Sequence, residues 1–232
     1  MLSVVDLIEA GTVSRELAGY TAAAIGRGAS FLVGAVPGGA GKTTVMGALL
    51  NLVPADVELR AADGMRAIRT GLDAPRPRAC YLCHEIGSGP YYAYLWGAEL
   101  RAYFELPGAG HILATNLHAD TYDQAREQIC GENGVSEQHL RRMHLMFFLE
   151  VGGWGRGANR RIVSAWESDG EGGHRQVFDV DTGLDVAASS LVSPDALSAG
   201  RERIERVLTS GAKTIQEVRA AVLAAAAEGE TA

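Results

Sequence analysis

The chain has 232 residues, of which 47% are hydrophobic and 21% charged, and its formal net charge is −7. This length and composition are typical of a globular α/β protein with one domain, or one domain and a small appendage. The negative charge argues against non-specific binding to nucleic acid, which normally needs a basic surface, so we expect no strong nucleic-acid partner.

In the first half of the chain, alternating helical and strand patterns predict an α/β core. Residues 1–28 predict two short amphipathic helices, the second capped near Ser14. The apolar run SFLVGAV (30–36) predicts a buried strand that leads through a glycine-rich turn into a helix at 41–53. Residues 57–63 predict a second strand.

The next segments predict a loop, a third strand and a long helix. Residues 66–78 are rich in arginine and proline and predict an exposed loop. The run ACYLCHEI (79–86) predicts another buried strand, and residues 91–106 predict a long aromatic helix. A fourth strand is expected at 111–117, and a helix follows at 120–130.

After a short helix near Ser136 the pattern changes. The runs MFFLEV, RRIVSAWES and HRQVFDV alternate with glycine-rich turns and predict antiparallel strands. Two helices are expected at 193–208 and 214–227, the second with a capping box formed by Thr214 and Glu217. The whole pattern predicts an α/β sheet with an antiparallel extension and a helical C-terminus.

The strongest motif is VPGGAGKTT, between the first strand and the helix that follows it. Glycines let successive backbone N–H groups face a phosphate, and the helix N-terminus favours negative charge. Val36 replaces the first glycine of the usual P-loop pattern, but the Gly-Lys-Thr-Thr end is intact. The expected nucleotide contacts are Pro37, Gly38, Gly39, Ala40, Gly41, Lys42, Thr43 and Thr44, with Lys42 on the β- and γ-phosphates and Thr43 on Mg²⁺. The cofactors expected are therefore ATP and Mg²⁺.

Two further residues follow predicted strands at the same edge of the sheet. Glu85 ends the third strand, where a carboxylate can order the attacking water or hold Mg²⁺. His118 follows the fourth strand, where an imidazole can sense the γ-phosphate. The alternatives are a solvated glutamate at a strand end and a structural histidine.

The cysteines suggest no disulfide framework. Cys80, Cys83 and His84 match the short haem attachment pattern, and the two cysteines have the spacing of half a zinc site. Because they lie in a predicted buried strand, we interpret them as small apolar side chains.

Several motifs, in this order, resemble one known family. Residues 110–120 (GHILATNLHAD) and the amphipathic stretch 123–129 resemble the histidine box of the ATPases of type II and type IV secretion and type IV pilus systems. Residues 39–44 resemble the Walker A motif of this family, and Glu85 matches its Walker B glutamate. The N-terminal helices resemble those of its tight-adherence and archaeal branch.

The resemblance implies a RecA-like P-loop core at 29–182, between N-terminal helices at 1–28 and a C-terminal helical segment at 183–232. It also implies ATP hydrolysis, a homo-oligomer in the form of a ring hexamer, and partners in a secretion or pilus machine at a membrane. We expect a cytoplasmic protein, because the sequence lacks a signal peptide pattern and an apolar run of the ~18–20 residues that cross a bilayer. A peripheral position at the inner face of the machine is left open.

The chain departs from the family pattern in places that bear on activity. Only Asp63 remains of an acidic pair after the second strand, and we expect it to contribute to nucleotide binding. The candidate arginine fingers are Arg60, Arg66, Arg69, Arg76 and Arg78, and solvated loop arginines are the alternative. These departures predict hydrolysis that is weak or depends on assembly. A nucleotide-binding accessory or switch protein with little turnover is one alternative, and a different P-loop enzyme is another.

Overall fold

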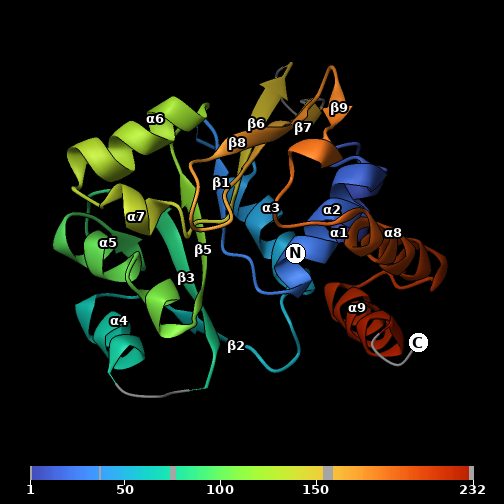
Figure 1. Cartoon of the computed structure of the whole chain (residues 1–232), viewed down its shortest axis with the longest axis horizontal. Coiled ribbons are helices and arrows are strands. Elements are labelled where there is room, and N and C mark those ends of the chain that lie inside the picture. Colours follow the sequence, from blue (N-terminus) through green and yellow to red (C-terminus); the bar gives the residue numbers. More distant parts are fainter. Residues whose placement is uncertain (1, 37, 74–76, 154–158, 230–232) are drawn as a thin grey trace.

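A central sheet separates two layers of helices in the computed structural model of the chain (Figure 1). The structure describes residues 2–36, 38–73, 77–153 and 159–229. Helices from both ends of the chain cover one face of the sheet, and helices from its middle cover the other.

The sheet has a parallel part and an antiparallel part. Its strands are β1 (Phe31–Gly34), β2 (Glu58–Ala61), β3 (Ala79–Ile86), β4 (Tyr94–Leu95), β5 (Ile112–Leu117), β6 (Leu145–Gly152), β7 (Asn159–Glu167), β8 (Arg175–Asp179) and β9 (Gly183–Leu184). They follow the order β2-β3-β5-β1-β6-β7-β8-β9, and β4 pairs with β3. Pairs from β2 to β6 are parallel, whereas β7, β8 and β9 join antiparallel to their neighbours. The predicted α/β class with an antiparallel extension is confirmed.

β1, which leads into the glycine-rich loop, lies inside the sheet. β5 pairs with it on one side and β6 on the other, and all four residues of β1 are buried. β5 is also buried along its whole length. Strands covered on both faces read as continuous apolar runs, which is why the sequence predicted these two correctly.

The two helical layers enclose two apolar cores. One layer consists of α1 (Val4–Glu9), α2 (Arg15–Gly26), α3 (Lys42–Leu49), α8 (Pro194–Thr209) and α9 (Ile215–Gly229). The other consists of α4 (Met65–Leu72), α5 (Ala98–Tyr103), α6 (Tyr122–Arg126) and α7 (Glu137–Leu140). A π-helical turn, Glu127–Glu132, continues α6. Cys80 packs in the first core and Cys83 in the second, so the two side chains lie on opposite faces of β3. Burial raises the pKa of both thiols to about 12.

The predicted helix caps at both ends of the chain are confirmed. The Ser14 side chain accepts a hydrogen bond from Leu17 N at the start of α2. At the start of α9, Thr214 Oγ1 accepts from Glu217 N, and the Glu217 carboxylate accepts from Thr214 N. These reciprocal bonds satisfy N–H groups that a helix leaves without partners at its start.

A buried carboxylate fastens the C-terminal segment to the sheet. Glu167, at the end of β7, is fully buried. Its oxygens accept from the hydroxyls of Tyr20 and Ser189 and from the backbone N–H groups of Ser190 and Leu191. A buried charge is tolerated only when donors surround it, and these four donors come from α2 and from the segment that leads to α8. The sequence analysis did not predict this contact of Glu167 with the C-terminal segment.

The prediction of an exposed loop at 66–78 is wrong for its first part. Residues 65–72 form α4, while residues 74–76 lie outside the described part of the chain. Ile68 is fully buried and Leu72 packs against the same core, four residues further along the helix. The burial of these two side chains at helical spacing stabilises a helix, and the arginines lie on its solvent side.

The prediction of a long helix at 91–106 is also wrong. The chain forms β4, the shorter helix α5 and a 3₁₀ turn at Leu106–Ala109. Gly97 has a positive φ of 58° before α5, and Ala93 has a φ of 54°, so both residues interrupt a helical path. Tyr91 and Tyr92 are 65% and 70% exposed, so they do not contribute to the core.

Within the described residues, the structure contains no helix that combines the length and the apolar character required to cross a membrane. The C-terminal helix α8 packs directly against the N-terminal helix α2. The boundaries 1–28, 29–182 and 183–232 remain predictions.

Candidate nucleotide-binding site

The glycine-rich loop connects the end of β1 to the start of α3. Gly39 and Gly41 have φ angles of 80° and 98°, in the left-handed region that favours glycine. Gly41 is the N-cap of α3. Because glycine has no side chain that could accept a hydrogen bond here, the first N–H groups of the helix remain available to an anion. Pro37 lies outside the described residues.

Val36 takes the place of the first glycine without backbone strain. Among the described residues other than glycine, only Ala93 has a positive φ, so the conformation of Val36 does not require a glycine. Its N–H donates to Asp120 Oδ1 at 2.6 Å, which ties the start of the loop to the segment after β5. The side chain is 47% exposed and points away from the core.

Lys42 lies at the centre of the site. It is 6% exposed. Its Nζ donates to Ala35 O at 3.2 Å and lies 3.4 Å from His118 Nδ1 and 3.7 Å from Glu85 Oε1. The three residues predicted to be catalytic therefore meet, although they come from the start of α3, from β3 and from the segment after β5.

Glu85 is held at the edge of the sheet by an irregularity in β3. The pairing of β3 with β5 shifts register between Cys83 and Ile86, and β4 pairs with β3 at this point. Such irregularities redirect a side chain. Glu85 is 5% exposed, and its Oε1 has no hydrogen-bond partner. A buried carboxylate oxygen without a donor marks a position for a water molecule or for a cation.

The contacts of His118 define its protonation. Lys42 carries only donors, so the His118 Nδ1 that faces it acts as the acceptor and the proton is assigned to Nε2. Nε2 lies 3.8 Å from Glu85 Oε1. The side chain is 50% exposed, so part of the ring remains accessible to a ligand.

Burial sets the electrostatics of these three groups. It raises the pKa of Glu85 above its ordinary value of 4.5, and Lys42 opposes this shift. It lowers the pKa of Lys42 from 10.5, and Glu85 opposes that shift. Burial and the neighbouring Lys42 lower the pKa of His118 from 6.5. The imidazole is therefore neutral at neutral pH.

The donor set fits a Mg²⁺ ion with a phosphate chain. Magnesium prefers oxygen ligands, usually one or two protein groups together with waters and phosphate oxygens. The Thr43 side chain is exposed in the first turn of α3, and Glu85 supplies the carboxylate oxygen without a partner. Thr43 and Glu85 are thus the residues that would hold the ion.

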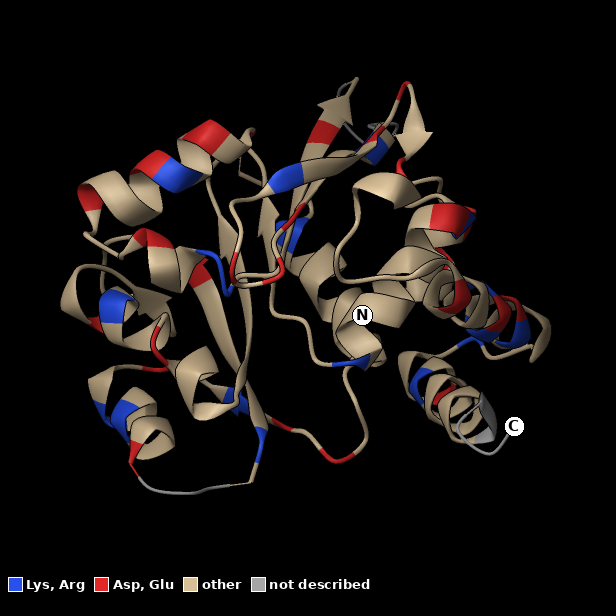
Figure 2. Cartoon of the chain, in the orientation of Figure 1, with Lys and Arg blue, Asp and Glu red and all other residues tan. Residues whose placement is uncertain are grey.

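Asp63 and two of the candidate arginine fingers lie beside β2, away from the glycine-rich loop, whereas Arg78 precedes β3 and lies at the opposite edge of the sheet. Asp63 lines a separate hollow with Arg60 and Arg66, next to the edge strand β2. Arg60 is paired with Glu58 at 2.6 Å. Figure 2 shows basic positions on α4, at the side of the molecule away from α8 and α9. Arg78 donates to the carbonyl groups of Arg27 and Gly28, and Arg76 lies outside the described residues.

Two residues near the loop were not predicted as site residues. Asp120 holds Val36 N, as described above, and Arg160 of β7 donates from Nη2 to Gly39 O at 3.4 Å. The position of Arg160 depends on the pairing of β6 with β7, and nothing in the sequence places residue 160 against residue 39. Asp120 falls inside the histidine-box segment, which is the one signal that could have identified it.

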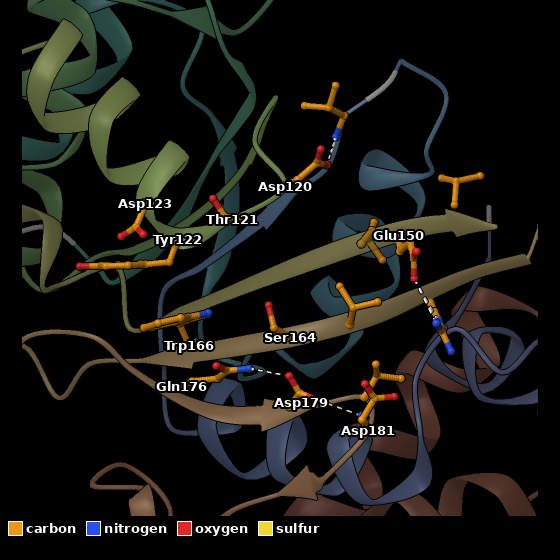
Figure 3. A pocket seen from close by; sticks show the side chains of 16 residues that line it. Asp120, Thr121, Tyr122, Asp123, Glu150, Ser164, Trp166, Gln176, Asp179 and Asp181 are labelled. Carbon is orange, nitrogen blue, oxygen red and sulfur yellow. Dashed lines mark hydrogen bonds and ion pairs between the residues drawn. The ribbon is translucent and has the colours of Figure 1, made fainter.

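A larger hollow of about 760 Å³ opens beside Val36, on the face of β6, β7 and β8 (Figure 3). Five carboxylates line it: Asp120, Asp123, Glu150, Asp179 and Asp181. Arg161 pairs with Glu150 at 3.1 Å, and the other four carboxylates keep the lining strongly acidic. Because phosphate groups are negative, this hollow does not suit a nucleotide.

No protein-family model matches the sequence, and no curated protein matches it. Among solved structures, the chain is similar to the VirB11 ATPase of the Brucella suis type IV secretion system, in complex with sulphate, with 18% identity and a TM-score of 0.49 over 70% of this chain and 54% of that chain. The Yersinia pseudotuberculosis ATPase DotB has 10% identity and a TM-score of 0.46, over 89% and 60% of the two chains. The Legionella pneumophila ATPase DotB has 11% identity and a TM-score of 0.39, over 84% and 51%.

The chain thus spans between about half and three-fifths of the length of these proteins. All three are ATPases, and the first belongs to a type IV secretion system, the class that the sequence motifs resemble. At these identities and TM-scores the similarity carries no functional weight, so the function of this chain has to be argued from the contacts of its own residues.

Proposed function

We propose that this protein binds ATP with Mg²⁺ at the loop between β1 and α3 and hydrolyses it. The observation that carries this proposal is the meeting of Lys42, Glu85 and His118 within 4 Å of one another beside that loop. The Glu85 Oε1 at the centre of this group accepts no hydrogen bond, although the Lys42 ammonium lies 3.7 Å away, so it can accept one from a water molecule.

Each residue has a defined role in this proposal. The loop N–H groups and Lys42 bind the β- and γ-phosphates, and Lys42 exchanges its contact with Ala35 O for phosphate oxygens. Glu85 orients the attacking water and accepts its proton, which its raised pKa favours. His118 lies beside Lys42 and donates from Nε2 toward the reacting phosphate. Thr43 and, through a water molecule, Glu85 would hold Mg²⁺, which would neutralise charge on the phosphates.

The wider role we propose is that of a motor ATPase in a type II or type IV secretion or type IV pilus system. In this proposal the protein forms a homo-oligomeric ring, such as a hexamer, and acts in the cytoplasm on components of the machine at the inner face of a membrane. The resemblance of the motifs supports this role. The expectation that Asp63 contributes to nucleotide binding stays a prediction.

The test compares wild type with Lys42→Ala and Glu85→Gln. We expect Mg²⁺-dependent ATP hydrolysis by wild type, loss of ATP binding in Lys42→Ala, and retained binding with turnover lowered about 100-fold or more in Glu85→Gln. Turnover should be followed across protein concentration with light scattering on the same samples. Glu99→Gln, on α5, is the matched control for the loss of a carboxylate and should keep full turnover. Unchanged turnover in Glu85→Gln would remove Glu85 from the mechanism.

A second candidate is a nucleotide-dependent switch with little turnover. The position of Asp63 favours it, because this acid lies beside Arg60 and Arg66 and none of the described contacts of Lys42 or Glu85 involves it. Tight ATP binding without turnover at any protein concentration would establish this role instead of the motor.

A further inference from the structure

A second hollow, of about 280 Å³, lies on the other side of the glycine-rich loop from the acidic one. We call it the α1 hollow. Its main walls are Leu2, Leu7 and Ala10 at α1, Thr44 and Val45 in α3, and Arg160 in β7. The volume is close to the lower end of the range for small-molecule sites (~300–1,000 Å³), which suits one part of a ligand whose remainder lies elsewhere.

The walls of this hollow are held in place before any ligand binds. At the start of α1, Ser3 N donates to Asp6 Oδ2 at 2.7 Å, and Asp6 N donates to Ser3 Oγ at 3.3 Å. At the end of the same segment, Thr12 O accepts from Ile162 N at 2.9 Å, so α1 is attached to β7. A preformed wall loses little conformational entropy on binding.

Arg160 approaches the loop at a point where only glycine fits well. A Cβ on Gly41 would lie 3.1 Å from Arg160 Cδ, and the φ of Gly41 is 98°. Nη2 donates to Gly39 O at 3.4 Å, so the planar guanidinium group is positioned over the loop and beside the hollow. Guanidinium planes stack favourably on aromatic rings.

The position of the hollow relative to the loop suggests its ligand. The first turn of α3 faces the phosphates, and a nucleotide base is joined to them through a ribose, so the base must lie beside the loop. Of the two hollows that border the loop, one carries five carboxylates and the other has apolar walls and a guanidinium group. An aromatic base attached to a negative phosphate chain is compatible only with the second.

We propose that the α1 hollow binds the base and ribose of a nucleoside triphosphate, between the apolar wall of α1 and the Arg160 guanidinium. This inference rests on the proposed nucleotide-binding function, which it extends to the nucleoside part of the ligand. The nucleotide then bridges α1, the loop and β7, three segments that are far apart in the sequence.

The test compares binding of ATP with binding of inorganic tripolyphosphate, which has no base or ribose. Ala10 is exposed at the C-terminal end of α1 and lines the hollow, so Ala10→Trp fills the hollow without disturbing the core. We expect Ala10→Trp to weaken ATP binding about tenfold or more and to leave tripolyphosphate binding within about twofold. Glu9→Trp is the matched control, because Glu9 is exposed and adjacent but does not line the hollow.

Arg160→Lys gives a second measurement that retains the charge. Because a lysine ammonium lacks the planar surface of the guanidinium group, ATP binding should weaken while tripolyphosphate binding stays unchanged. If wild type binds tripolyphosphate as tightly as ATP, or if Ala10→Trp binds ATP like wild type, the inference is overturned and the proposed function still stands. If wild type binds neither compound, both are overturned.

Discussion

The Glu85 carboxylate occupies an environment that changes its chemistry. In water a glutamate is a weak base, whereas here burial raises its pKa above 4.5 and leaves Oε1 without a donor. Lys42, 3.7 Å away, opposes this rise in the pKa of Glu85. The pair therefore acts as one unit, and removal of either charge alters the other.

The protonation of Glu85 predicts the pH dependence of ATP turnover. Burial raises the pKa of Glu85 above 4.5, so turnover should fall as the pH decreases through this raised pKa, because a protonated Glu85 cannot accept a proton from water. The measurement is kcat against pH, with ATP affinity determined at each point. The acidic limb should persist in His118→Gln. An acidic limb centred below pH 4.5, or one abolished in that variant, would contradict the assignment to Glu85.

At the scale of single residues, the sequence indicated which side chains would come together, because the ends of buried strands can be recognised in it. Lys42, Glu85 and His118 each follow an apolar run, and parallel strands bring their carboxyl ends to one edge. Arg160 could not be predicted, because its place over Gly39 depends on the pairing of β6 with β7. Contacts between distant segments need the topology as well as the pattern.

At the scale of elements, the buried strands and the capped helices were predicted correctly, and the two errors share one cause. In both, side-chain type was given more weight than spacing. Arginines and prolines suggested a loop where Ile68 and Leu72 form the buried stripe of α4, and aromatic residues suggested a helix where Tyr91 and Tyr92 are exposed. Tertiary burial, which composition does not show, decides such segments.

The contact between α2 and α8 joins the two ends of the chain, and it depends on glycine. A Cβ on Gly200 would lie 2.2 Å from Gly19 O and 3.0 Å from Ala23 Cβ, so the helices pack with their backbones in close contact. We expect Gly200→Ala to lower the free energy of unfolding by about 1–3 kcal/mol, because the extra methyl group forces the helices apart. Urea denaturation measures this change.

The control for this prediction is Ser198→Ala, in the same helix. Ser198 is exposed, and alanine is the better helix former, so this variant should match wild type or exceed its stability slightly. If Gly200→Ala were as stable as Ser198→Ala, the two helices would not pack in such close contact in solution.

At the scale of the whole molecule, the sheet order separates the basic edge from the nucleotide site. β2 lies three strands from β1. Neighbouring strands are ~4.8 Å apart, so α4, which follows β2, begins ~14 Å or more from the glycine-rich loop. Arg66 and Arg69 of α4 are exposed at this edge. An arginine at that distance cannot contact the phosphates of its own subunit, but it can contact those of a neighbour in a ring with head-to-tail interfaces.

This geometry predicts activity that is shared between subunits. We expect the double variant Arg66→Ala, Arg69→Ala to bind ATP like wild type and to lose turnover about 100-fold or more, as arginine fingers do. Mixing it with inactive Lys42→Ala should restore part of the turnover. In a randomly mixed ring about a quarter of the interfaces combine an intact loop with intact arginines. Unchanged turnover in the double variant would show that these arginines are merely solvated. Lost turnover without recovery on mixing would mean that they act within their own subunit, which the sheet order opposes.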